Sequence, residues 1–227
     1  MTRALVTGAN RGIGLELCRQ LAARGSDVVA ACRASSAELD TLARGSGGKV
    51  QLETGVEVTS DASVRALAGK LAGARIDLLV LNAGILMMGG SVEAPDFEAI
   101  RKQLEVNAIG PLRVASALLP NLAQGAKIAV ITSRMGSIAD NGSGGMYGYR
   151  MSKAAVNMAA VSLAKDLRPR GVAVAVLHPG MVKTDMTGQH GTVEPADAVR
   201  GLLARIDALT LDKSGGFWHA NGEQLPW

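Results

Sequence analysis

Short runs of apolar residues alternate along this chain with segments whose apolar residues recur at helical spacing. The runs predict strands at residues 4–6, 28–32, 50–58, 78–81, 128–131 and 172–177, with a short last strand at 215–219. Helices are expected at residues 13–24, 37–44, 62–71, 95–120, 147–167 and 195–209. Strands that are apolar throughout must be covered on both faces, which favours a parallel sheet. The expected fold class is therefore α/β, with a doubly wound parallel β-sheet and helices on both faces.

Composition narrows the functional classes. The net charge is +4, but the basic residues are scattered among acids, with no run longer than Arg101-Lys102. Nucleic-acid binding, which needs a clustered basic surface, is not expected. The longest apolar stretch, residues 76–88, is broken by Asp77 and Asn82 and is too short to cross a membrane. The first residues enter a strand pattern with no signal peptide, so we expect a cytoplasmic protein without a membrane partner.

The two cysteines, Cys18 and Cys32, have no CxxC neighbour and no spacing typical of metal ligands. We interpret both as small buried hydrophobic residues. No metal site is expected.

A glycine-rich turn, Gly8-x-x-x-Gly12-x-Gly14, lies between the first expected strand and the first expected helix. Glycines let the backbone approach a diphosphate, and the helix N-terminus supplies free N–H groups and partial positive charge. A purely structural turn is the alternative. The strand–turn–helix setting favours the phosphate site.

Two arginines indicate which dinucleotide binds. In such folds the end of the second strand faces the adenosine ribose. Arg33 stands there, with no acid until Glu38, and Arg11 lies inside the glycine turn. Two cations suit a 2′-phosphate, so we predict NADP(H) in preference to NAD(H). The alternative is that both are solvated surface charges.

Tyr149 and Lys153 lie four residues apart on an expected helix and so share one face. An ammonium near a phenol favours the phenolate and lowers its pKa, which makes a tyrosine useful for proton transfer near neutral pH. Tyr147 is the rival, but its partner four residues on is Met151. Tyr149 is therefore the preferred proton donor.

Ser133 follows the fifth expected strand, at the edge where open α/β sheets place their ligands. Its hydroxyl is a candidate donor to a substrate oxygen, with Thr132 and Ser137 as alternatives nearby.

Three further polar residues occupy suggestive places. Asn82 follows the fourth strand, where it would bond cofactor or neighbouring backbone. Asn107 lies in an otherwise apolar helical stretch, where a local structural bond and a catalytic role are equally favoured. His178, beside Pro179, has no carboxylate to orient it and is a weaker candidate acid or base.

As a set, these motifs resemble those of the short-chain dehydrogenases/reductases over essentially the whole chain. The matching motifs, in family order, are Thr7-Gly8-x-x-x-Gly12-x-Gly14, Asn82-Ala83-Gly84, Asn107, Ser133, Tyr149-x-x-x-Lys153 and Pro179-Gly180. Segments 132–138, 145–153 and 178–186, and the ending from Gly216 to Trp227, look like the branch of C-factor and sniffer-type carbonyl reductases. The resemblance implies one Rossmann-type domain over residues 1–227, with a cofactor half at about 1–135 and a catalytic and substrate half at about 136–227.

The resemblance also implies a mechanism. Ser133 would bond the substrate carbonyl, and Tyr149 would donate the proton as hydride arrives from NADPH. Lys153 would bind the nicotinamide ribose and lower the pKa of Tyr149, while Asn107 would help hold a proton-relaying water. The implied cofactor contacts are Gly8, Asn10, Arg11, Gly12, Ile13, Gly14, Arg33, Val58, Asn82, Ala83, Gly84, Tyr149, Lys153, Pro179, Gly180, Val182 and Thr184.

The expected activity is thus NADPH-dependent reduction of a small ketone, aldehyde or quinone. The alternative is an NAD(P)-binding regulatory or signalling protein with little turnover. By resemblance we also expect a homodimer or homotetramer that associates through the long helices at about residues 95–120 and 147–167.

Two features set this chain apart within the pattern. Ser133 precedes Tyr149 by 16 residues, so the intervening loop, residues 136–145, must arch. The segment 186–193, which forms the substrate lid in this family, is short, so a small lid and an open pocket are expected.

Overall fold

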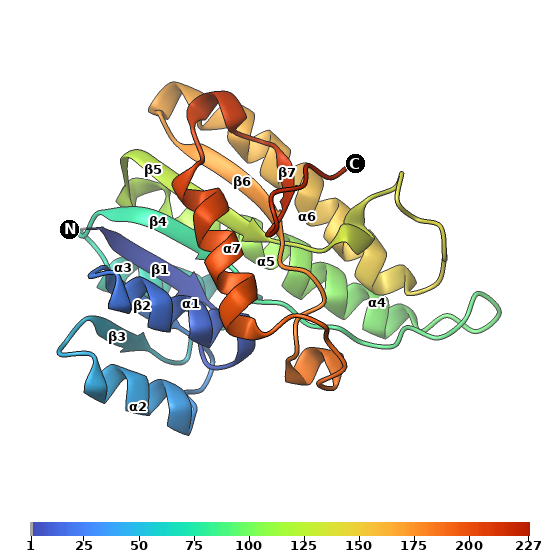
Figure 1. Cartoon of the computed structure of the whole chain (residues 1–227), viewed down its shortest axis with the longest axis horizontal. Coiled ribbons are helices and arrows are strands. Elements are labelled where there is room, and N and C mark those ends of the chain that lie inside the picture. The colour runs from blue at the N-terminus through green and yellow to red at the C-terminus, as the bar shows by residue number, and fades with distance from the viewer. Residues whose placement is uncertain (1) are drawn as a thin grey trace.

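Seven parallel strands form the sheet at the centre of the computed structural model, which describes residues 2–227 (Figure 1). Their order across the sheet is β3-β2-β1-β4-β5-β6-β7. The strands are β1 Arg3–Thr7, β2 Asp27–Ala31, β3 Val50–Glu53, β4 Ile76–Leu81, β5 Leu122–Ile131, β6 Ala173–His178 and β7 Phe217–His219. The order reverses between β1 and β4, so the carboxyl ends of these two strands border the crevice where such sheets bind ligands.

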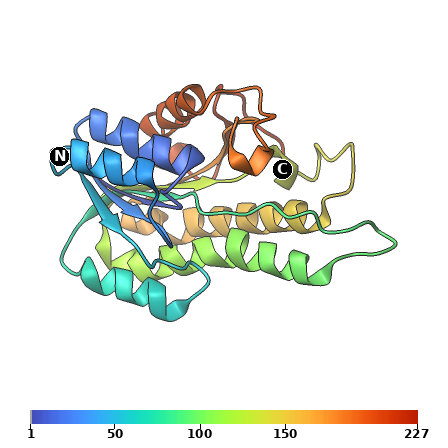
Figure 2. The same cartoon turned by 90° about the horizontal axis from the view of Figure 1, so that it is seen from below.

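Helices cover both faces of the sheet, as Figure 2 shows. One face carries α1 Gly12–Ala23, α2 Ala37–Gly45 and α7 Pro195–Asp207. The other carries α3 Asp61–Lys70, α4 Phe97–Leu104, α5 Gly110–Leu118 and α6 Tyr147–Asp166. The predicted doubly wound parallel sheet is confirmed.

The pleat of the strands explains the two layers of core. Neighbouring strand residues point to opposite faces, so Leu5 packs under α3, α5 and α6 while Ala4 and Val6 pack under α1 and α7. All three are fully buried. This is why the strands are apolar at every position.

Side chains fix where several helices begin. Ser36, Ser60 and Asp96 each accept a hydrogen bond from the backbone N–H three residues on, at the starts of α2, α3 and α4. Such caps satisfy donors that the first helical turn leaves unpaired. The observed starts of these helices lie within two residues of the expected ones.

The predicted strand at residues 50–58 is wrong beyond Glu53, where β3 ends. The chain then crosses the end of β2, because Gly55 N donates to Arg33 O and Val56 N donates to Cys32 O. Gly55 has φ +75°, a turn conformation that favours glycine. Val56 and Val58 are buried, but they cover the end of the sheet rather than extend a strand.

The expected helix at residues 95–120 is divided. A π-helical turn, Glu105–Ile109, separates α4 from α5, and a 3-10 turn, Leu119–Asn121, follows α5. The widened turn contains Asn107, so the irregularity coincides with a candidate site residue.

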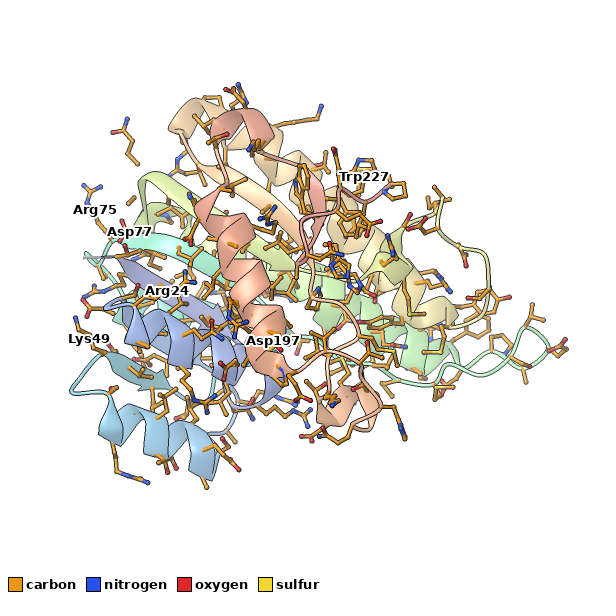
Figure 3. All side chains as sticks on the ribbon, viewed as in Figure 1. Arg24, Lys49, Arg75, Asp77, Asp197 and Trp227 are labelled. Carbon is orange, nitrogen blue, oxygen red and sulfur yellow. The ribbon has the colours of Figure 1, made fainter. Side chains whose placement is uncertain are left out.

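Two long connections extend beyond the sheet at one end of the molecule (Figure 2). They are residues 82–96, between β4 and α4, and residues 137–146, which precede α6. Trp227 also lies away from Lys49, Arg75 and Asp77, which gather near the opposite end of the sheet (Figure 3). In the described chain, residues 2–227, no helix combines the length and apolar character needed to cross a membrane.

Candidate active site

A cleft of about 600 Å³ opens at the carboxyl ends of β1, β2 and β4. Twelve of the residues expected to contact a cofactor line it: Gly8, Asn10, Arg11, Gly12, Ile13, Gly14, Arg33, Val58, Asn82, Ala83, Gly84 and Thr184. The sheet topology therefore brings segments far apart in the sequence to one groove.

The glycine turn is shaped by contacts that no larger residue would allow. Gly8 and Gly12 have φ of +67° and +53°. A Cβ on Gly14 would overlap the carbonyl oxygen of Gly8 and lie 2.7 Å from Asn82 Nδ2. Arg11, the N-cap of α1, makes no side-chain capping bond. The free N–H groups at this helix start suit a diphosphate.

Asn82 locks the turn to the end of β4. Its Nδ2 donates to Thr7 O at 3.0 Å and to Gly8 O at 3.3 Å. In return, Thr7 Oγ1 accepts from Asn82 N at 3.0 Å and Ala83 N at 3.1 Å. Of the two roles expected for Asn82, the structure shows the bond to neighbouring backbone.

The two arginines expected to meet a 2′-phosphate each lie near a carboxylate. Arg33 is 3.7 Å from Glu57, and Arg11 is 3.6 Å from Asp185. Arg33, Arg11 and Asp185 are largely exposed and Glu57 is partly exposed, so these pairs are weak. The acid closest to Arg33 is thus Glu57, from the segment after β3, and not Glu38 of α2.

Ser133, Tyr149 and Lys153 meet beyond the carboxyl end of β5. Ser133 lies just after the end of β5, in extended backbone, and Tyr149 and Lys153 lie on the first turns of α6. The Ser133 hydroxyl lies near enough to the Tyr149 phenol to lower its pKa. Lys153 Nζ lies 5.6 Å from the centre of the Tyr149 ring and donates to Ile131 O at 3.2 Å. The three predicted catalytic side chains therefore form one cluster.

Burial controls the titration of this cluster. Lys153 is 6% exposed, and loss of hydration lowers its pKa to about 8. Burial also raises the pKa of Tyr149, and the nearby Ser133 hydroxyl offsets this only in part. The pKa of Tyr149 therefore lies above its ordinary value, not below it as expected, because desolvation outweighs any lowering by the Lys153 charge.

Asn107 links the cluster to the segment after β4. Its Oδ1 accepts from Ile85 N at 2.8 Å, and its Nδ2 donates to Ile85 O at 2.8 Å and Ser152 Oγ at 3.0 Å. Ser152 Oγ in turn donates to Tyr149 O at 2.8 Å. Both amide hydrogens of Asn107 are used, which favours the structural role that its sequence position left open.

Gly84 is where the cleft meets the cluster. A Cβ there would lie 3.3 Å from Asn107 Oδ1 and 3.7 Å from Lys153 Nζ. Gly84 also lines the cleft. A dinucleotide in the cleft would therefore end beside Lys153.

The alternatives near Ser133 are engaged elsewhere. Thr132 Oγ1 donates to Asn157 Oδ1 at 2.7 Å, and Ser137 Oγ accepts from Asp140 N at 3.1 Å. Tyr147 is 40% exposed at the start of α6. Ser133 Oγ itself accepts from Met135 N at 3.2 Å, which leaves its hydrogen free to donate. Ser133 and Tyr149 stay the candidates for hydrogen-bond donor and proton donor.

His178 lies edge-on to His219, with ring centres 4.8 Å apart. Burial, together with the nearby charges of His219, Arg134 and Lys153, lowers the pKa of His178 to about 3. It is therefore neutral at physiological pH and is no proton donor there.

The remaining predicted contacts follow β6. Pro179, Gly180 and Val182 do not line the cleft, whereas Thr184 does; the predicted contacts Tyr149 and Lys153 of α6 do not line it either. The short segment 186–193 folds back, since Lys183 N donates to Val193 O at 2.9 Å. Met186 of this segment reaches the cleft.

Several lining residues were not predicted as cofactor contacts: Cys32, Val56, Glu57, Thr59, Ile85, Lys102, Glu105, Val106, Asp185 and Met186. Most of these residues are close to a predicted cofactor contact in the sequence, so their position at a strand end could have identified them. Lys102, Glu105 and Val106 had no such signal, because their approach depends on how α4 crosses the sheet.

Comparisons with known proteins agree with this geometry. The family model described as short chain dehydrogenase matches residues 2–194. A 1-hydroxy-2-glutathionyl-2-methyl-3-butene dehydrogenase from Rhodococcus sp. is 44% identical over 233 residues, covering 100% of both chains. C-signal from Myxococcus xanthus is 46% identical over 166 residues, covering 72% of this chain and 100% of that protein.

Solved structures show the same architecture. Carbonyl reductase Sniffer of D. melanogaster superposes with a TM-score of 0.92 at 28% identity over 100% of both chains. An NADPH-bound carbonyl reductase from chicken fatty liver gives 0.91 at 32% identity, covering 100% of this chain and 99% of that one.

Proposed function

Since the chain belongs to the short-chain dehydrogenase family, we propose that it is an NADPH-dependent reductase of a small ketone, aldehyde or quinone. The observation that carries the proposal is the cluster of Ser133, Tyr149 and Lys153, which adjoins the cleft at Gly84. The cluster offers a hydrogen-bond donor, a proton donor and a cation in one place.

The cleft fits a dinucleotide. The glycine turn and the start of α1 would hold the diphosphate, Asn82 to Gly84 would border the nicotinamide ribose, and Lys153 would bond the ribose hydroxyls. The bound cofactor supplies a hydride to the carbonyl carbon.

Side chains of the protein supply the proton for the reaction. Ser133 donates a hydrogen bond to the carbonyl oxygen, and Tyr149 transfers its phenolic proton to that oxygen as it gains charge. Burial keeps Tyr149 protonated at neutral pH, which suits a donor in the reductive direction. Lys153, with a pKa of about 8, is largely cationic at pH 7 and stabilises the phenolate that remains.

The NADP(H) preference is part of the proposal. Arg11 and Arg33 lie at the cleft and would face a 2′-phosphate. Two similar reductases support this choice. The chicken carbonyl reductase is NADPH-bound, and a carbonyl reductase from Pseudomonas aeruginosa, 32% identical to this chain with a TM-score of 0.86, was crystallised in complex with NADP.

The test combines binding with turnover. Titration with NADPH and NADH, followed by cofactor fluorescence, measures the preference directly. A carbonyl panel with NADPH, and the glutathionyl alcohol of the Rhodococcus relative with NADP⁺, measures turnover in both directions. Tyr149→Phe is expected to lower kcat about 10²- to 10⁴-fold while NADPH still binds. Unchanged kcat in Tyr149→Phe would refute the mechanism.

The similarity to C-signal keeps a second function in view, an NAD(P)-binding signalling protein with little turnover. Firm NADPH binding without turnover on the whole panel is the result that favours it.

Association into a homodimer or homotetramer is proposed through α4, α5 and α6. The supporting observation is a set of exposed apolar residues on these helices and the turn between them: Phe97, Ile109, Leu112, Tyr147, Met151 and Met158. A monomeric mass in light scattering at micromolar concentration would contradict it.

A further inference from the structure

Gln103 is a fully buried polar residue in α4, with 0% of its surface exposed. Its Oε1 accepts from Met87 N at 3.0 Å, and its Nε2 donates to Ala99 O at 3.3 Å. A buried amide is unfavourable unless its bonds are made, and a leucine of similar size would fill the same space. The amide therefore serves the backbone of Met87, which would otherwise lack an acceptor.

Gln103 and Asn107 both bond the segment that follows β4. The two lie four residues apart and so project from the same helical face. Asn107 bonds the backbone of Ile85 on both sides, and Gln103 bonds Met87, two residues further on. Two side-chain amides thus hold alternate residues of one extended segment, as a neighbouring strand would. We call Gln103 and Asn107 the amide pair.

Gln103 also touches the helix that carries the proton donor. A Cβ on Gly148 would lie 2.5 Å from Gln103 Nε2 and 3.1 Å from Ile100 Cα. The amide of Gln103 therefore occupies space that the missing side chain of Gly148 leaves, one residue before Tyr149. This contact sets how closely the first turn of α6 approaches α4.

From these contacts we propose that Gln103 is a positioning residue for Tyr149, which also fixes the segment around Met87 that leaves the cluster on the substrate side. The proposal rests on the proposed function. Gln103 does not itself line the cleft, and its side chain bonds Met87 and Ala99 rather than Ser133, so it acts through Gly148 and Met87 and is not itself catalytic.

The test is Gln103→Leu, with Gln103→Glu as the conservative variant and Arg101→Leu as the matched control. Gln103→Leu is expected to lower kcat at least tenfold and to raise the KM of the carbonyl substrate. Its NADPH dissociation constant should stay within twofold, because Asn107 still holds Ile85 and the glycine turn is untouched. Gln103→Glu keeps an acceptor for Met87 N, and burial favours the protonated acid, whose hydroxyl can donate to Ala99 O in place of the amide; this variant should recover kcat to within about threefold. Arg101 is exposed on the same helix, and Arg101→Leu should match wild type.

Hydrogen exchange gives an independent readout. The Met87 amide should exchange at least tenfold faster in Gln103→Leu than in wild type, while the Ile85 amide, bonded to Asn107, changes little. Equal acceleration at both amides would show general loosening and overturn the positioning role.

The possible failures are separable. Wild-type protein without carbonyl turnover would defeat the proposed function and this role with it. Wild-type turnover with unchanged kcat and KM in Gln103→Leu would overturn this proposal alone. If Gln103→Leu does not fold, an unrescued tenfold loss of kcat in a folded Gln103→Glu protein would overturn it too, since the acceptor is retained there.

Discussion

Lys153 lies beneath Tyr149, its ammonium 5.6 Å from the centre of the ring and bonded to the carbonyl of Ile131. The last residue of β5 thus holds the lysine, whose Nζ lies 3.7 Å from the place of a Cβ on Gly84, at the end of the cleft. Burying the charged ammonium of Lys153 is unfavourable. We therefore expect a measurable effect on the free energy of unfolding.

The stability of the protein should rise between pH 8 and about pH 10 because of Lys153. Its pKa is lowered from 10.5 to about 8 in the folded state, so the unfolded state binds more protons across this window and unfolding becomes harder as pH rises. The full effect is up to about 3 kcal/mol. Urea unfolding at pH 7.5, 8.5 and 9.5 measures it.

Lys153→Met supplies the reference for that measurement. Burial raises the pKa values of Cys18 and Cys32, which opposes the trend near and above pH 9. The difference between wild type and Lys153→Met removes their contribution. A difference that stays constant with pH would contradict the prediction.

Gly14→Ala should abolish tight cofactor binding. Its Cβ would overlap Gly8 O and press on Asn82 Nδ2, so the turn must open and about 1–3 kcal/mol of stability is lost. NADPH affinity is expected to fall more than tenfold. The matched control is Gly69→Ala in α3, where a Cβ meets nothing and helix propensity adds roughly 0.5–1 kcal/mol. Comparable NADPH affinity in the two variants would show that the close packing is irrelevant.

Arg33 and Glu57 should act in opposite directions on cofactor choice. Arg33→Asp is expected to weaken NADPH at least tenfold and to leave NADH unchanged or tighter. Glu57→Gln removes the carboxylate 3.7 Å from Arg33 and should tighten NADPH a few-fold. Fluorescence titrations at one ionic strength give all four constants, since exposed charges are screened by salt. Arg33 has no 2′-phosphate role if Arg33→Asp weakens both cofactors equally.

Arg134 should hold the C-terminal segment over the loop before α6. It pairs with Asp140 at 3.0 Å and with Glu223, while Ala139 N donates to Trp227 O at 2.8 Å. Arg134→Leu is expected to speed hydrogen exchange at the Ala139 amide severalfold, and Glu223→Gln to do so less. Arg200→Leu, which removes an exposed pair on α7, is the control. Unchanged exchange at Ala139 in Arg134→Leu would show that the tail is held without Arg134, by the stacking of Trp227 on Phe217 and by backbone bonds such as that from Leu225 N to Phe217 O.

Much of this architecture was accessible from the sequence because its causes are local. Apolar strands, serine and aspartate caps and the glycine turn each act over a few residues, so the strands, the cleft and the cluster of Ser133, Tyr149 and Lys153 were expected. The end of β3 was misplaced because Val56 and Val58 are buried for a different reason, the crossing of the chain over β2.

Other features depend on distant segments and had no local signal. Glu57 meets Arg33 only after the fold is formed. The pKa of Tyr149 was expected to fall because the spacing to Lys153 is visible in the sequence while the depth of burial is not. The sequence does not distinguish Gln103 from any other glutamine on a helix, because its contacts with α6 and with the segment after β4 form only in the folded protein.

Within the segment after β4, the amide pair bonds main-chain atoms of residues 85 and 87 and none of their side chains. Any residue except proline can meet that requirement at position 85 or 87, because only proline lacks the N–H that both bonds need. The side chains of Leu86, Met87 and Met88 are therefore free to diversify while the backbone beneath them keeps its course, whereas the Ile85 side chain also lines the cleft. Under the proposed function, a directed-evolution library randomised at these three codons should change which substrates are accepted and leave Ser133, Tyr149 and Lys153 in place.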